Sequence, residues 1–162
     1  MKLNLGIGIK DPMEGYVNLD ILPVKIEDAT KAQWIKQGDF RNPASANLNK
    51  SSFDEIRVSH IIRNIHVTQL GLVINNWKEL LIQGGELYLE FLDAELVGNL
   101  LAYQQLPLES INMMIFGDNP KAQFCGLYSL TAIEPLLHNL GFETIEKGYI
   151  DRLNAFIRVR KL

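Results

Sequence analysis

The chain has 162 residues, 47% of them hydrophobic and 22% charged, with a formal net charge of −3 and a single cysteine. Its length and apolar content suit one globular domain with a sizeable core. The slight negative charge argues against nucleic-acid binding through a basic surface, and the lone Cys125 argues against a disulfide framework or a cysteine-rich zinc site. No apolar stretch approaches the ~20 residues of a membrane span. These features predict a cytoplasmic protein without a bound metal.

Strand-like and helix-like segments alternate along the chain, which predicts an α/β fold with a mainly parallel sheet. Residues 2–5 and 16–21 are short strand-like runs, and a third strand is expected to begin near residues 34–35. Residues 41–52 are rich in Asn, Ser, Ala and Pro and therefore predict a loop. The run FDEIRVSHII, residues 53–62, predicts the next strand.

The second half of the chain contains further helical patterns and three strand-like runs. Apolar residues at helical spacing predict a helix over 66–81, which the glycines of QGG are expected to cap. The alternating ELYLEFLD predicts a strand, followed by a helix to about Gln105 and a long connection to Tyr128. Ser129 is the expected N-cap of a helix over 130–140. The segments FETIEKGYI and NAFIRVRK close the chain as a predicted antiparallel pair.

Two glycines interrupt the first strand, in the segment LNLGIGIK at residues 3–10. Glycine has no Cβ, so Gly6 and Gly8 predict either a tight turn or a backbone that lies against a ligand. Asp20 ends the second strand, and the ends of parallel strands line the ligand site of an open α/β sheet. A dinucleotide site is disfavoured, because the few residues between Gly8 and Tyr16 leave no room for a crossover helix and no third glycine follows.

Six segments occur in order along nearly the whole chain: LNLGIG, GYVNLD, GD, SFDEIRVSH, LLIQGGELYLEF and LGFETIE. As a set they resemble the class I S-adenosylmethionine-dependent methyltransferases, in particular the small bacterial and phage members that begin at the first strand. The resemblance implies one methyltransferase-like domain over residues 1–162. It also implies a Rossmann-like α/β fold, with a mostly parallel seven-stranded sheet, one antiparallel strand and helices on both faces. The implied cofactor is S-adenosylmethionine.

The resemblance also assigns cofactor contacts to the ends of the first two strands. Leu5, Gly6 and Gly8 would lie against the methionine and ribose, where a glycine backbone leaves the room that a side chain would fill. Asp20, with Ile21 beside it, would accept hydrogen bonds from the ribose hydroxyls, and its charge would favour a cationic sulfonium nearby. The alternatives are that the glycines only form a turn and that Asp20 only caps the following segment.

The ends of the third and fourth strands complete the implied site. Asp39 would meet the adenine amino group, with Phe40 against the ring, unless Asp39 is simply a solvated loop residue. Ser59 and His60 would face the methyl group and the acceptor. Histidine titrates near neutral pH, so we expect His60 to act as the base or orienting group. The alternative is that its ring only seals the cofactor or caps the next helix.

The acceptor side is expected to be lined by Phe124 and Tyr128, on the long segment before the last predicted helix. The expected reaction is methyl transfer to an oxygen or nitrogen of a small molecule or peptide. No separate substrate domain is visible, so a second copy of the chain or a partner protein could complete the acceptor pocket.

Three residues depart from the pattern of the family. Ile7 stands between the two glycines, where many relatives have a small residue, and Arg63 and Asn64 replace an acid and a histidine. These departures keep two alternatives open. The chain could be a methyltransferase fold that serves as a binding or scaffold subunit, or another enzyme that uses an adenosyl ligand on the same fold.

Overall fold

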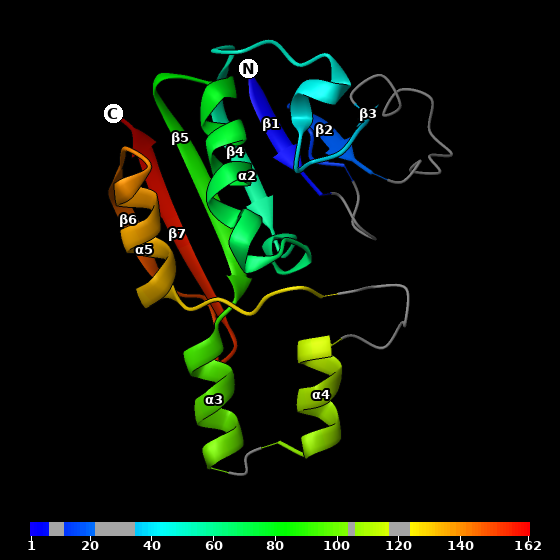
Figure 1. The fold of residues 1–162 in the computed structure, drawn as a ribbon, viewed down its shortest axis with the longest axis vertical. Coiled ribbons are helices and arrows are strands. Elements are labelled where there is room, and N and C mark those ends of the chain that lie inside the picture. The colour runs from blue at the N-terminus through cyan, green and yellow to red at the C-terminus, as the bar shows by residue number, and fades with distance from the viewer. Residues whose placement is uncertain (7–11, 22–34, 104–105, 117–123) are drawn as a thin grey trace.

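Seven strands form one twisted sheet at the centre of the computed structural model, in the order β3-β2-β1-β4-β5-β7-β6 (Figure 1). The structure describes residues 1–6, 12–21, 35–103, 106–116 and 124–162. The strands span Lys2–Leu5 (β1), Tyr16–Asp20 (β2), Ile35–Gln37 (β3), Phe53–Ser59 (β4), Leu81–Leu92 (β5), Phe142–Tyr149 (β6) and Asn154–Lys161 (β7). The first five run parallel, and β7 is antiparallel to both of its neighbours. The predicted sheet, with its one antiparallel strand, is confirmed.

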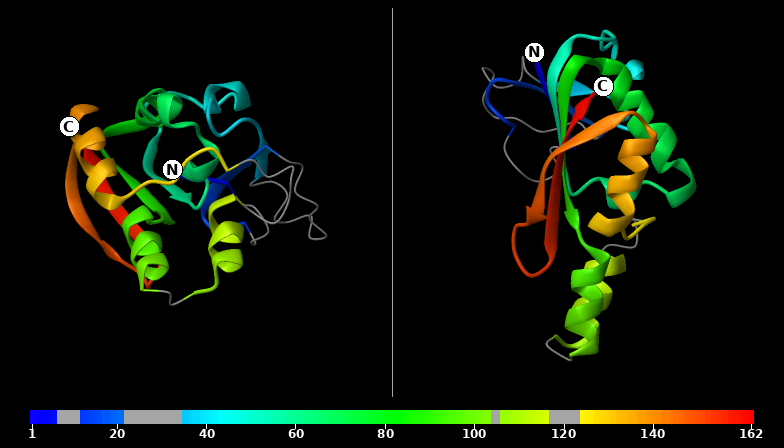
Figure 2. Two further views of the ribbon diagram at one scale, coloured as in Figure 1. Left: turned by 60° about the horizontal axis from the view of Figure 1, so that its bottom comes forward. Right: turned by 90° about the vertical axis from the view of Figure 1, so that its left-hand side faces the viewer.

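Two of the described helices, α2 (Val67–Leu80) and α5 (Leu130–Asn139), lie on the same face of the sheet (Figure 2). Helices α3 (Ala94–Ala102) and α4 (Leu108–Phe116) extend beyond the end of the sheet. The sequence predicts helices on both faces, whereas no helix of the described residues covers the second face. Within these same ranges, no helix is long and apolar enough to cross a membrane.

The hydrophobic core lies between the sheet and these two helices. Alternate residues of the central strands point into it, and the helices close it with their apolar sides. Trp77 of α2 is fully buried, and its indole N–H donates to the carbonyl oxygen of Phe40 at 2.7 Å. The helical periodicity therefore identified the core side of α2 correctly except at its first turn, where Val67 is exposed.

The QGG segment does not cap α2, which corrects the expectation from the sequence. The helix ends at Leu80, and the next residue already has extended dihedrals as the first residue of β5. The terminal carbonyl oxygens instead accept hydrogen bonds from Ser51 N, Ser52 N and the Lys161 ammonium. The glycines lie in β5, where the register with β4 shifts and Gly84 has a φ of 76°.

Two short helices interrupt segments that the sequence predicts as connections. Residues 41–52 contain the 3-10 helix η1 (Pro43–Ala46), and the connection to Tyr128 contains α4. In α4 only Ile111 is buried among the described side chains, while Leu108, Met113 and Phe116 are exposed. Because its apolar residues do not line a single buried face, its helical period was not evident in the sequence.

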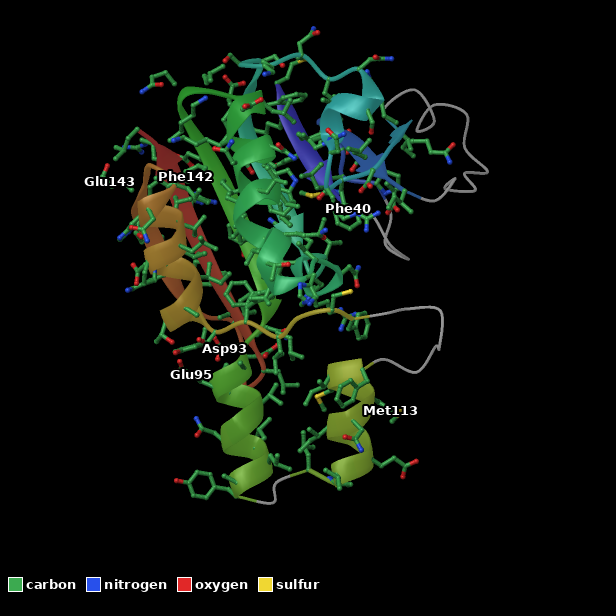
Figure 3. The ribbon with its side chains drawn as sticks, viewed as in Figure 1. Phe40, Asp93, Glu95, Met113, Phe142 and Glu143 are labelled. Carbon is green, nitrogen blue, oxygen red and sulfur yellow. The ribbon has the colours of Figure 1, made fainter. Side chains whose placement is uncertain are left out.

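A buried carboxyl group joins the end of β5 to two helices. Asp93 has no exposed surface, and Figure 3 shows it where β5 passes into α3. Its Oδ1 accepts from the backbone N–H of Glu95 and Leu96 at 2.9 and 3.0 Å, and its Oδ2 accepts from Leu130 N at 2.7 Å. One side chain therefore caps α3 and fixes the start of α5. Ser129 caps the same helix by accepting from Ala132 N, as the sequence predicts.

Replacing Asp93 with alanine leaves three N–H groups without this acceptor. We expect Asp93→Ala to lower the free energy of unfolding by about 3 kcal/mol, the scale for unsatisfied buried donors. Urea unfolding followed by tryptophan fluorescence measures it. Asn99→Ala, at an exposed position in the middle of α3, is the matched control and should change stability by less than about 0.5 kcal/mol. Equal stability of the two variants would contradict this role of Asp93.

Candidate active site at the carboxyl edge of the sheet

The residues predicted from the strand ends lie along one edge of the sheet. Because β1, β2 and β4 are parallel neighbours, Gly6, Asp20 and His60 leave their strands at the same edge. Gly6 N donates to the carbonyl oxygen of Leu19 at 2.9 Å, and Gly38 N donates to that of Asp20 at 2.9 Å. These hydrogen bonds set the spacing of the first three strand ends. Gly8 and Ile7 lie outside the described residues.

Gly6 is required by the packing of the protein itself. Its φ is 78°, and a Cβ at this position would lie 2.1 Å from the Cγ2 of Ile61. Both facts exclude a side chain here. Leu5, directly before it, has its side chain in the core, so only its backbone can face the edge. The tight-turn interpretation of Gly6 therefore holds in this structure, whether or not a ligand also approaches.

Asp39, shortly after the end of β3, is paired with a neighbouring arginine. Asp39 accepts three hydrogen bonds from the Arg41 guanidinium and one from Arg41 N. Burial opposes ionisation of Asp39, but these hydrogen bonds outweigh it and lower the pKa of the carboxyl group. The Phe40 side chain is only 7% exposed and packs in the core, and its place against the adenine ring stays a prediction. Ile21, just after β2, is exposed.

His60 directly follows β4 and has a backbone conformation uncommon for a residue other than glycine, with a φ of 59°. Its N–H donates to the carbonyl oxygen of Glu90 at 2.8 Å, and its Nε2 lies 3.1 Å from Glu90 Oε1. The other carboxylate oxygen of Glu90 accepts from Arg57 at 3.3 Å. A carboxylate that holds Nε2–H places the basic lone pair of a neutral imidazole on Nδ1. The arrangement can therefore accept a proton at a defined atom.

Two buried polar atoms near the end of β4 have no hydrogen-bond partner among the described residues. They are the hydroxyl oxygen of Ser59 and the Nε of Arg63, which lies in the 3-10 helix η2 (Ile62–Asn64). Native proteins satisfy nearly all such atoms, so a cluster of exceptions needs an explanation. Its position at the carboxyl edge agrees with a site that a ligand completes.

Residues 124–128 cross below the ends of β4 and β5 (Figure 1). They form hydrogen bonds with η2 at one end and with the start of α3 at the other. The N–H groups of Cys125 and Gly126 donate to the carbonyl oxygen of Arg63 at 2.6 and 3.1 Å. Tyr128 is only 6% exposed, and its hydroxyl donates to the Ile65 carbonyl oxygen at 2.6 Å. Burial raises the pKa of this phenol. Tyr128 therefore anchors the segment from within the core, and its place on the acceptor side stays a prediction.

Phe124 begins this segment and contacts Arg63 of η2, and its place on the acceptor side stays a prediction. The Arg63 guanidinium stacks over its ring, with 3.7 Å between the guanidinium carbon and the ring centroid.

Glu90 and Arg57 are candidate site residues that the sequence did not reveal. The alternation in ELYLEFLD was the available signal, because it places Glu90 on the side of the strand opposite the apolar residues.

No protein-family model matches this sequence, and no curated protein matches it. Solved structures do match the fold. A methyltransferase from Methanosarcina mazei described as S-adenosylmethionine-dependent superposes with a TM-score of 0.68 at 15% identity, covering 99% of this chain and 92% of that one. A Pyrococcus horikoshii protein gives 0.66 at 16%, covering 99% and 81%. The magnesium protoporphyrin IX methyltransferase of Synechocystis, solved with bound SAH, gives 0.63 at 14%, covering 99% and 74%.

The chain has the class I methyltransferase fold. This agrees with the resemblance noted in the sequence, which rests on the same strands. In this fold the carboxyl edge described above includes the switch point between β1 and β4, where the strand order reverses and open α/β sheets bind their ligands.

The packing of Gly6 against Ile61 can be tested through stability. We expect Gly6→Ala to lower the free energy of unfolding by about 3 kcal/mol, from backbone strain and overpacking together. Gly15→Ala measures the backbone term alone, because Gly15 has a φ of 77° and no atom near its Cβ position. In an Ile61→Ala background, the cost of Gly6→Ala should fall toward the Gly15 value, because the atoms that crowd the added Cβ are gone. Urea unfolding of all variants gives the comparison.

Gly98→Ala supplies the control for this series. Gly98 lies inside α3 with no atom near its Cβ position, so alanine there should raise stability by up to about 1 kcal/mol. If Gly6→Ala were as stable as the parent chain, the assigned contact would be refuted.

Proposed function

We propose that this protein transfers a methyl group from S-adenosylmethionine to an oxygen or nitrogen of a small molecule or peptide. The observation that carries the proposal is the placement of Gly6, Asp20 and His60 on one edge of a sheet with the methyltransferase strand order. This edge combines a close-packed backbone turn, a carboxylate and an oriented histidine, which are the groups that such a transfer uses.

The residues at this edge suit the cofactor. The carboxylate of Asp20 can accept hydrogen bonds from the two ribose hydroxyls, and its charge favours a sulfonium nearby. The Ser59 hydroxyl, which has no hydrogen-bond partner among the described residues, can bind a polar group of the ligand at the end of β4. The Asp39–Arg41 pair stiffens the end of β3. When bound, S-adenosylmethionine supplies a methyl group activated for in-line displacement.

His60 and Glu90 would handle the proton. The sulfonium of S-adenosylmethionine would supply the methyl group, and the proton that the acceptor loses would pass to His60 Nδ1. Glu90 keeps Nε2–H in place and stabilises the imidazolium that results. Arg57 holds the second oxygen of Glu90, so the carboxylate keeps its orientation. The chain's own contribution is thus alignment and proton transfer.

Asp20→Ala tests the cofactor assignment. Loss of a charge-assisted pair should weaken binding of S-adenosylmethionine by roughly 2 to 3 kcal/mol in a calorimetric titration. Asp54→Ala is the matched control. This carboxylate lies near the start of β4, at the opposite edge of the sheet, where it pairs with the amino terminus. An affinity loss below about tenfold for Asp20→Ala would count against the assignment. No binding by the parent chain would refute the cofactor itself.

His60→Ala tests the base. On any acceptor that the parent methylates, turnover should fall by ~100-fold or more, lose its pH dependence near neutrality and leave cofactor affinity nearly unchanged. Glu90→Gln should move the pH profile of turnover, whereas Glu86→Gln, four residues earlier on the same strand, should not. A parallel loss of cofactor affinity in His60→Ala would indicate a sealing role. Unchanged turnover would exclude both roles.

A further inference from the structure

Arg63 is held in a fixed position at the carboxyl edge, three residues after His60. Its carbonyl oxygen receives two backbone hydrogen bonds from Cys125 and Gly126, and its guanidinium stacks on the ring of Phe124. A stacked guanidinium presents its N–H groups in the plane parallel to the ring. The donors of Arg63 are therefore preorganised before any ligand arrives.

The charge of Arg63 has no counterion in the part of the chain that the structure describes. Arg41, Arg57 and Arg160 each pair with a carboxylate, from Asp39, Glu90 and Glu86 respectively. Arg63 makes no such pair, and its Nε is buried without an acceptor. Burial also lowers the pKa of its guanidinium. A buried donor on a cation is costly to leave unsatisfied, so this position calls for an acceptor that the described residues do not supply.

We propose that Arg63 binds an anionic group of the methyl acceptor, a carboxylate or a phosphate. This inference rests on the proposed function, because it names the substrate class for the same edge. Guanidinium groups bind both anions through paired N–H donors, and the Phe124 ring fixes the plane in which they approach. The anion serves as an anchor, while a separate oxygen or nitrogen of the same molecule lies toward His60 and accepts the methyl group.

The test uses benzoate and phenyl phosphate as probes, with benzamide as the uncharged match. Each is titrated into the ¹⁵N-labelled full chain, with and without S-adenosylhomocysteine, in a buffer free of phosphate and carboxylates. The side-chain Nε–H resonance of Arg63 is assigned by its loss in Arg63→Lys. We expect this resonance to shift saturably with at least one anion and not with benzamide. The tighter anion identifies the source of the charge as carboxylate or phosphate.

Variants then test whether the affinity for the anion depends on the Arg63 side chain. Arg63→Met should raise the dissociation constant of the preferred anion by about tenfold or more, and Arg63→Lys should give a smaller loss because it keeps the charge without the planar fork. Arg160→Met, on β7, is the control and should change the constant by less than about twofold. An unmoved Arg63 resonance, an equal shift with benzamide, or the same affinity in Arg63→Met would each overturn the proposal. The first two outcomes need no variant to fold.

Calorimetry with S-adenosylhomocysteine on the same samples separates this proposal from the proposed function. Binding of the cofactor product without anion binding would refute the role of Arg63 and leave the methyltransferase assignment standing. Anion binding at Arg63 without any binding of S-adenosylhomocysteine would refute the methyltransferase assignment, and with it the identity of the anion as a methyl acceptor.

Discussion

The buried carboxyl group of Asp93 holds together the end of the molecule at which the candidate site lies. Its three backbone hydrogen bonds join the end of β5 to the first turns of α3 and α5. Residues 124–128 approach this junction from the side of the site, and the Arg63 carbonyl oxygen fixes their other end. Residues 124–128 are thus hydrogen-bonded at both ends, to Arg63 shortly after β4 and to Ala94 shortly after β5. Asp93 therefore supports the Tyr128 end of this segment, while the hydrogen bonds to the Arg63 carbonyl oxygen support the end that carries Phe124.

Unfavourable local features gather within a few residues of the end of β4. His60 adopts a positive φ, and Ser59 and Arg63 each bury a polar atom without a partner among the described residues. Such features persist only where the surroundings are rigid, and β4 is hydrogen-bonded between β1 and β5 near the centre of the sheet. Strain and unsatisfied polarity concentrated at the ligand edge of an α/β fold are typical of a site shaped for binding rather than for stability.

The two faces of the sheet have different chemistry, which explains how a glutamate is accommodated in a central strand. One face packs apolar residues beneath α2 and α5. On the other, Arg57 lies over the ring of Tyr88 and pairs with Glu90, while Tyr88 also stacks with Phe156. Aromatic rings shield the stems of the charged residues and leave their polar heads accessible. The Glu90 carboxylate beside His60 belongs to a side chain that is only 15% exposed, and the nearby Arg57 balances its charge.

The sequence alone located the strands, the helices α2, α3 and α5, and the edge at which the candidate site lies, but not η1 or α4. Its periodicities located every strand of the sheet, and the rule that parallel strands end together placed Gly6, Asp20 and His60 side by side. Only the tertiary structure decided the contacts between distant segments. The last carbonyl groups of α2 are satisfied by Ser51, Ser52 and Lys161, so the QGG glycines were free to form a bulge in β5. The Tyr128 hydroxyl donates to a carbonyl oxygen 63 residues away in the sequence. Arg63 likewise stacks on Phe124 because the fold brings these distant segments together. Local patterns record which face a residue presents, whereas hydrogen bonds between remote segments depend on which segments the completed fold brings together.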